Sequence, residues 1–284
     1  AEIQKRSTIV SELRSTAKES QYNVMDYLKK QVEAGKAKNL QSFYIVNGIA
    51  VTATKEVMEQ VALMEEVELI SLNETVELVR PSVTATDIAT VKEVENAVQP
   101  ASIEWNISQI NAPDAWAMGV DGTGTVVASI DSGVQWDHPA LKEKYRGYDP
   151  ANPNSPSHEF NFFDSTSIGG DEAYDDNGHG THVTGTMVGS EPNGNNQIGV
   201  APGAKWIAVK ALSASGGGTT ADLLEAGEWI LAPKDAEGNP HPEMAPDVVN
   251  NSWGGGPGLN EWFRPMVQAW RAAEIFPEFS AGNT

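Results

Sequence analysis

Two titratable side chains and one amide occur beside predicted buried strands or at the start of a helical segment. Asp131 closes the apolar run 126–130, His179 opens a segment of small residues 48 positions later, and Asn283 follows the apolar run 275–279. Functional groups of parallel sheets gather at the carboxyl ends of the strands, so we expect these residues to share one edge. A carboxylate that orients an imidazole, an imidazole that moves a proton and an amide that donates to an oxyanion are the groups that acyl transfer requires.

Other chemistry is open to the same residues. An aspartate at a strand end can simply cap a turn. His179 and His182 stand three residues apart, a spacing that could place two metal ligands on one helix face. The sequence has no HExxH motif and no cysteine, and this segment supplies no third zinc ligand. A metallohydrolase built on these histidines and the nearby aspartates therefore stays an alternative, and it predicts inhibition by chelators.

The elements that must position these groups follow from periodicity. Apolar runs predict buried strands at 126–130, 206–209, 248–249 and 275–279, and helical patterns lie between them at 182–189, 220–232 and 260–273. Strands that alternate with helices predict an α/β fold, with a parallel sheet covered by helices on both faces.

The first hundred residues have a different pattern. They predict a helix over 7–33, strands over 42–46 and 49–52, a helix after the N-cap Thr54 and a strand over 67–72. The dipeptide Asn47-Gly48 favours a tight hairpin between the two strands. This is a small α+β module, and the stretch 81–100, bracketed by prolines, predicts a linker and a domain boundary near residue 100.

Three segments together resemble the successive signatures of the subtilase family of serine proteases. They are residues 129–134 (Ser-Ile-Asp-Ser-Gly-Val), 179–183 (His-Gly-Thr-His-Val) and 280–283 (Ser-Ala-Gly-Asn). The resemblance implies that Asp131 holds the imidazole tautomer, His179 is the general base and Asn283 donates to the oxyanion, while His182 is structural. It further implies that residues 101–284 are the N-terminal part of a secreted catalytic domain. Residues 1–100 would be a ferredoxin-like propeptide that inhibits and assists folding.

The resemblance also marks two substrate-binding segments. Gly216, Gly217 and Gly218, together with Ser252, Trp253 and Gly254, match the edges that pair with an extended peptide. Glycine permits the close backbone approach that strand addition needs. Without the resemblance, residues 216–218 would be interpreted as a glycine-rich surface loop. Trp253 is expected near the walls of the substrate pocket, where it would narrow or reshape them.

The nucleophile is missing from the sequence. The family carries it in a Gly-Thr-Ser-Met-Ala segment, which does not occur in these 284 residues, and neither Ser252 nor Ser280 takes its place. We expect a C-terminal remainder of the same polypeptide to supply it, and this chain alone to be inactive. The leading hypothesis is the precursor of an extracellular serine endopeptidase that cleaves proteins. The alternative is a non-catalytic fragment that acts as an inhibitory or binding module.

Composition excludes some partners. The chain has 19 basic and 39 acidic residues and a formal charge of -20, which argues against a nucleic-acid surface. It has no cysteine, and no apolar stretch approaches the roughly 20 residues that a membrane span needs.

The predicted triad needs no cofactor, but a structural calcium ion is possible because hard oxygen ligands are plentiful. The candidate ligands are the loop 191–197 and the cluster Asp164, Asp171, Asp175 and Asp176.

Overall fold

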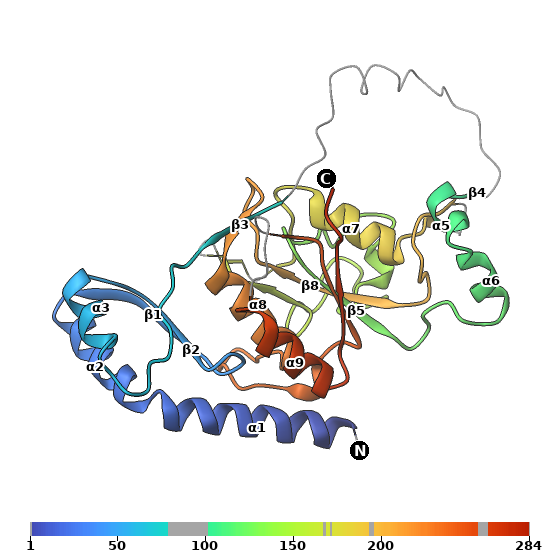
Figure 1. Ribbon diagram of the computed structural model, residues 1–284. Coiled ribbons are helices and arrows are strands. Elements are labelled where there is room, and N and C mark those ends of the chain that lie inside the picture. The colour runs from blue at the N-terminus through green and yellow to red at the C-terminus, as the bar shows by residue number, and fades with distance from the viewer. Residues whose placement is uncertain are drawn as a thin grey trace.

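The computed structural model describes residues 2–78, 102–166, 169–170, 172–192, 196–254 and 261–283 (Figure 1). Residues 2–78 form an N-terminal module of helices and a hairpin, and residues 102–283 form an α/β body. The predicted linker 81–100 lies outside the described residues, so the boundary near residue 100 stays a prediction.

The α/β body is built on a five-stranded sheet whose order is β11-β10-β5-β8-β6. Every pair of neighbouring strands is parallel, which confirms the predicted sheet. The strands are β5 (Val126–Asp131), β6 (Phe162–Asp164), β8 (Lys205–Lys210), β10 (Val248–Asn251) and β11 (Phe276–Phe279). We call the side where the strands begin the amino edge and the side where they end the carboxyl edge.

Helices cover both faces of this sheet, as predicted. Ala128 and Ile130 of β5 point to the face covered by α8 (Thr220–Leu231) and α9 (Arg264–Ala272). Val127 points to the opposite face, where it belongs to the same cluster as Val188 of α7 (His179–Val188). This alternation follows from the two-residue period of a strand. Helix α8 begins with a capping box between Thr219 and Asp222.

Short elements complete the body. They are β4 (Ser102–Ile103), α5 (Trp105–Gln109), α6 (Ala112–Ala117), the 3-10 turn η1 (Lys142–Lys144), β7 (Asn196–Gln197), β9 (Gly217–Thr219) and the 3-10 turn η3 (Pro242–Met244). The strand predicted over 275–279 forms as β11, at the edge of the described sheet, but it is only partly buried. Ile275, directly before it, is 1% exposed, whereas Phe276 and Phe279 are 61% and 45% exposed.

The N-terminal module packs two helices and a hairpin around a core of valine and leucine. Its elements are α1 (Glu2–Ser20), α2 (Tyr22–Glu33), β1 (Ala37–Phe43), β2 (Gly48–Ala53), α3 (Lys55–Val61) and β3 (Thr75–Glu77). Its core residues are Val24, Leu28, Val57 and Val61. The helix predicted after Thr54 is therefore confirmed, although the Thr54 side chain makes no capping hydrogen bond.

The single helix predicted over 7–33 is wrong, because the chain turns at Gln21 between α1 and α2. The Gln21 side chain is buried against the hairpin: it accepts a hydrogen bond from Ser42 Oγ (2.6 Å) and donates one to the Phe43 carbonyl (3.0 Å). These contacts fix the turn, and no helical periodicity could reveal them.

The antiparallel hairpin is confirmed, but its turn is longer than predicted. Phe43 pairs with Gly48, so residues 44–46 lie in the turn and not in the first strand. Their amides find partners elsewhere, since Tyr44 N and Ile45 N donate to Glu228 of α8.

The strand predicted over 67–72 does not form. Within the described residues no strand pairs with this segment, and Leu69 and Leu72 are 65% and 84% exposed. A β-prone composition does not make a strand without a neighbouring backbone that supplies hydrogen bonds.

Candidate active site

Asp131 and His179 meet at the carboxyl edge of the sheet. Asp131 ends the central strand β5, and His179 is the first residue of α7. His179 Nδ1 lies 2.8 Å from Asp131 Oδ1; the carboxylate is 1% exposed and the imidazole 33%. A carboxylate can only accept, so Nδ1 carries the shared proton and Nε2 is the basic nitrogen. This pair can orient an imidazole for proton transfer.

Two glycines allow this close approach. A Cβ on Gly180 would lie 2.1 Å from the Gly133 carbonyl oxygen and 3.2 Å from Asp131 Oδ1. Gly133 itself has φ of +99°, and a Cβ there would lie 2.0 Å from the Tyr174 carbonyl oxygen. A side chain at Gly180 would push α7 away from Asp131 and Gly133, and one at Gly133 would push away the segment at Tyr174 that leads to α7. The glycines that follow Asp131 and His179 in the sequence are therefore packing requirements of the pair.

Asp175 fixes the start of α7. Its Oδ1 accepts hydrogen bonds from Ser132 Oγ (2.9 Å), Asn177 N (3.0 Å) and Gly178 N (2.8 Å). Its Oδ2 accepts from Thr181 N (2.9 Å) and Thr181 Oγ1 (2.6 Å). Burial alone would raise the pKa of Asp175, but hydrogen bonds from Thr181, Gly178 and Asn177 outweigh it and hold the pKa below its ordinary value. The ionised carboxylate thus joins β5 to the residues on both sides of His179.

A buried lysine supports the same region. Lys210 ends β8, is 0% exposed, and donates from Nζ to the carbonyls of Ser132 (2.9 Å) and Leu212 (2.8 Å). It also pairs with Asp176 Oδ1 at 2.6 Å. A buried ammonium is costly unless its donors are satisfied, and here all three have acceptors. Lys210 therefore fixes the backbone after Asp131 to the loop before His179.

The predicted substrate-binding glycines contact a strand of the same chain. β3 of the N-terminal module pairs antiparallel with β9, and Glu77 forms a further antiparallel bridge with Gly254. Leu78 N donates to the Gly216 carbonyl at 2.9 Å. The side chain of Val76 is buried in the core of the α/β body. Residues 75–78 therefore lie as an extended strand between residues 216–219 and Gly254, and we call the space that they fill the groove. A role of these glycines in substrate binding stays a prediction.

Ser252 and Trp253 precede Gly254 in the same segment. Ser252 Oγ accepts a hydrogen bond from Asn250 Nδ2 at 2.8 Å. Trp253 is 8% exposed, and its ring meets Phe263 and Phe279 edge-on, with centroids 5.2 and 5.9 Å away. The indole is therefore part of the core between α9 and β11, directly beside the groove.

Comparison with known proteins identifies the family of this chain. The profile of the "Subtilase family" matches residues 122–284, which is more than half of the chain. The chain belongs to the subtilase family. A second profile, "Peptidase inhibitor I9", matches residues 4–79 of this subtilase, which is the N-terminal module.

Individual relatives agree with the family. The subtilase is similar to Bacillopeptidase F of Bacillus subtilis (strain 168), with 64% identity over 284 residues, which are 100% of this chain and 19% of that protein. It is 30% identical to Minor extracellular protease Vpr of the same organism over 99% of this chain and 34% of that protein. Identity to Subtilisin Savinase of Lederbergia lenta is 38% over 45% of this chain and 40% of that protein. The chain therefore spans between about a fifth and two fifths of these relatives.

The third predicted site residue, Asn283, lies beyond the end of β11. Ser280 N donates to the Asn251 carbonyl at 3.1 Å, which keeps the segment at the carboxyl edge next to β10. Asn283 itself is exposed. β10 separates β11 from β5, so Asn283 and Asp131 belong to the same edge of the sheet, two strands apart. Its role at the oxyanion stays a prediction.

Among the calcium candidates, the residues that the structure describes do not gather into a group of carboxylates around one point. Within the described residues, no group of three or more histidine, aspartate or glutamate side chains could hold an ion. Asp164 accepts hydrogen bonds from Thr166 and Tyr174, and Asp176 pairs with Lys210. Asp171 and residues 193–195 of the loop 191–197 lie outside the described residues. The alternative zinc pair is also not assembled, because His179 Nδ1 bonds Asp131 and His182 is exposed.

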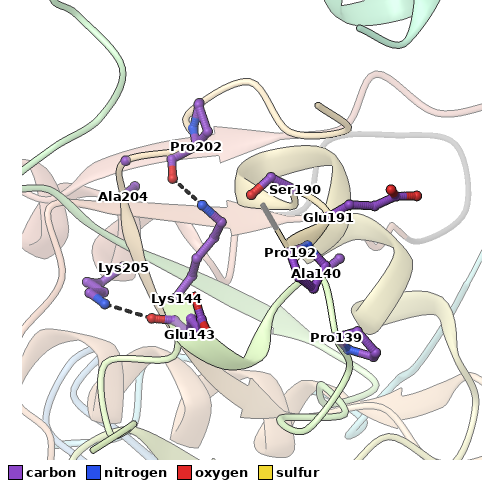
Figure 2. Close-up of a pocket in the computed structure, with 11 residues that line it drawn as sticks. Pro139, Ala140, Glu143, Lys144, Ser190, Glu191, Pro192, Pro202, Ala204 and Lys205 are labelled. Atoms are coloured by element: carbon purple, nitrogen blue, oxygen red, sulfur yellow. Dashed lines mark hydrogen bonds between the residues drawn. The ribbon is translucent and has the colours of Figure 1, made fainter. Parts of the chain in front are cut away.

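A cavity of about 300 Å³ lies elsewhere, between η1 and the segments 190–192 and 202–205 (Figure 2). Lys144 donates to the Pro202 carbonyl and Lys205 to the Glu143 carbonyl (2.7 Å). Burial, and then the charge of Lys205, lowers the pKa of Lys144. Lys205 begins β8 and Lys210 ends it, so the cavity opens at the amino edge and the candidate active site lies at the other edge.

Sequence reasoning missed the residues that support the pair. Asp175 was considered only as a calcium ligand, although its position four residues before His179 is a signal that it could fix the helix start. Lys210 follows the predicted strand 206–209 and was not singled out. Its burial depends on carbonyls of Ser132 and Leu212 and on Asp176, which only the fold brings together. As for membranes, none of the described helices combines the length and the apolar character that a bilayer crossing needs.

Proposed function

We propose that this chain is the leading part of a subtilisin-like serine endopeptidase precursor. The single observation that carries the proposal is the hydrogen bond between buried Asp131 and His179, made at the carboxyl edge of a subtilase sheet and beside a groove that accepts an extended strand. The serine nucleophile is supplied from outside these 284 residues. By itself the chain is inactive.

In the proposed reaction His179 Nε2 takes the proton of the serine hydroxyl as it attacks a peptide carbonyl, and then gives it to the leaving amine. Asp131 keeps the proton on Nδ1 and stabilises the imidazolium that forms. Asp175 and Lys210 act through these two residues by holding their backbones. The chemistry uses a carboxylate, an imidazole, a hydroxyl and an amide.

Asn283 is the proposed donor to the oxyanion. An amide at this position stabilises charge that exists only in the transition state, so its loss lowers kcat by about 10²- to 10³-fold, the magnitude known from a subtilisin. Protein substrates bind by adding a strand between β9 and Gly254, and Trp253 shapes the pocket beside them.

The N-terminal module is the proposed propeptide. The support is that its match is to an inhibitor family and that its own residues 75–78 lie where a substrate would bind. Removal of the module would open the groove. The similarity to a protease described as extracellular supports secretion of the complete protein. The alternative is that the chain is a non-catalytic fragment that inhibits or binds another protein. The same observation, β3 in the groove, supports it.

A serine-directed fluorophosphonate separates the two views. The complete polypeptide, extended to the length of its relatives, should be labelled on a serine after autoprocessing, and the 284-residue chain should not. His179→Ala should abolish labelling, whereas His182→Ala, an exposed histidine on the same helix, should leave it unchanged. Labelling that survives His179→Ala would contradict the proposed triad. Hydrolysis that a chelator abolishes, with no labelling or inhibition by the fluorophosphonate, would favour the metallohydrolase.

A further inference from the structure

Arg6 of the N-terminal module is almost completely buried against the α/β body. It lies in the second turn of α1, and its side chain is 5% exposed. Helix α1 runs along the lower side of the molecule beneath α9, far from β3 in the same view (Figure 1). Arginine is seldom buried without partners, because desolvating the guanidinium is costly. Its partners should therefore explain what α1 does there.

The guanidinium donates to three backbone carbonyls of the α/β body. Nε donates to Ala273 (2.9 Å), Nη1 to Ala245 (3.3 Å) and Nη2 to Pro246 (3.3 Å). The planar fork of arginine suits several acceptors at fixed angles, which a lysine ammonium cannot match.

Negative charges around the Arg6 guanidinium also favour its position against the α/β body. Nη2 also lies 2.8 Å from Glu2 and 3.9 Å from Asp247. Ala273 directly follows α9, so its carbonyl belongs to the negative end of that helix.

These acceptors lie at the amino edge of the sheet. Ala245 and Pro246 precede β10, and Ala273 precedes β11. Asp247 Oδ2 accepts from Val126 N, the first residue of β5. Asp131 stands at the other end of β5. Arg6 therefore contacts the body where the strands begin, whereas β3 contacts it at β9 and Gly254, beside the groove.

We propose that Arg6 forms a second attachment of the N-terminal module, separate from the groove. We call the contact of Arg6 with Ala245, Pro246 and Ala273 the amino-edge attachment, and that of β3 with β9 and Gly254 the groove attachment. The inference rests on the proposed function, in which the module is a propeptide. After the bond between module and body is cut, the amino-edge attachment keeps the module bound and delays the appearance of activity.

The physical reason is effective concentration. While one attachment holds, the other rebinds as an intramolecular event, so two moderate contacts make a slowly dissociating inhibitor. A protein substrate can displace β3 from the groove by competition. It cannot compete for the amino-edge attachment, because no substrate binds there. Release of the module then depends on Arg6 and its carbonyls as well as on the groove attachment.

The first test uses hydrogen–deuterium exchange on the complete precursor carrying His179→Ala, which stays uncut. Arg6→Met should raise exchange about tenfold or more in α1 and at the amides of Ile275 and Phe276, because hydrogen bonds of a charged donor are among the stronger ones. Protection of β3 and β9 should not change. Arg14→Met, an exposed arginine of the same helix, is the matched control and should leave exchange unchanged. This measurement needs no protease activity, so it stands even if the proposed function fails.

The second test follows the cleavable precursor. Arg6→Met should shorten the delay between cleavage and full activity by about tenfold or more, while kcat and KM of the released enzyme, which lacks Arg6, stay the same. Unchanged exchange and unchanged delay would overturn the proposal. Equal loss of protection in β3 would also overturn it, since the two attachments would then be one unit.

If Arg6→Met fails to fold, the more conservative variant Arg6→Lys tests the same contact. Arg6→Lys keeps the charge but cannot reach three carbonyls, so it should show most of the Arg6→Met effect. Wild-type behaviour of Arg6→Lys would overturn the role of the three carbonyls.

Discussion

At Gly180, α7 passes so close to β5 that a side chain has no room. The Cβ of an alanine would lie 2.1 Å from the Gly133 carbonyl oxygen, about 1 Å inside a normal contact, so His179 must move relative to Asp131. We predict that Gly180→Ala lowers kcat of the complete enzyme about 10²-fold, the effect of a 1 Å misplacement. Steady-state kinetics on a peptide substrate measures it.

Gly185 is the matched control within the same helix. A Cβ there meets nothing within 4 Å, so Gly185→Ala should keep activity and stabilise the helix by about 0.5–1 kcal/mol. Equal activity of the two variants would show that α7 can shift away from β5 without harming the site.

Asp175 should make the stability of the α/β body depend on acid pH. Its pKa is held below the ordinary 3.8 in the folded protein, so its contribution is fully present above 3.8 and is lost as pH falls through the lower folded pKa. Asp175→Asn should therefore lower Tm at pH 7, and the difference from wild type should shrink as the pH approaches and passes the folded pKa. Thermal unfolding of the His179→Ala precursor, with and without Asp175→Asn, from about pH 2 to about pH 7 measures this difference in Tm. A Tm difference that does not change over this range would mean that Asp175 acts without its charge.

At the scale of elements, the sequence predicted what depends on local patterns. The apolar runs that became β5 and β8, and the helix that starts at His179, have short-range signals in their period and their glycines. Strand boundaries that depend on distant partners were missed. Residues 44–46 lie in the turn instead of the first strand, where Tyr44 N and Ile45 N bind Glu228, 184 and 183 positions away. The segment 67–72 had strand composition but no described partner strand.

The same division holds for the candidate site. Asp131 and His179 were found because each stands beside glycines that form a recognisable motif. Asp175 and Lys210 were missed as site residues, and Arg6 and Glu228 as contacts between the module and the body, since their roles come from groups that only the folded chain brings together. A charged residue that forms hydrogen bonds with backbone carbonyls or amides produces no periodic pattern in the sequence.

Trp253 links the groove to the packing of α9 and β11. Replacing it with leucine removes two edge-on ring contacts and leaves space beside the groove. We predict that Trp253→Leu changes the ratio of kcat/KM for large and small side chains at the cleavage site by about tenfold in favour of the large ones. Cleavage of a matched peptide series measures it, with Trp105→Leu, an exposed tryptophan, as control. Identical ratios would place the indole outside the specificity pocket.

At the scale of the whole molecule, the module and the body meet at a third point, the hairpin turn on α8. Glu228 is 3% exposed and accepts from Tyr44 N (2.5 Å) and Ile45 N (3.3 Å), while Lys234 lies 3.6 Å away. Burial raises the pKa of Glu228, although Lys234 and the two amides oppose the rise. Because Ile45 is 1% exposed, its amide has no access to water when the carboxylate is removed.

Glu228→Ala should therefore speed release of the module after cleavage. A buried amide without an acceptor costs about 1–3 kcal/mol, which is about 5- to 150-fold in the release rate. Glu228 and Arg6 share no partner, so their free energies should add to within about 0.5 kcal/mol in the double variant. The delay before activity in the two single variants and the double variant measures this cycle. A double variant no faster than Glu228→Ala alone would mean that the hairpin turn holds the module by itself and that α1 follows it passively.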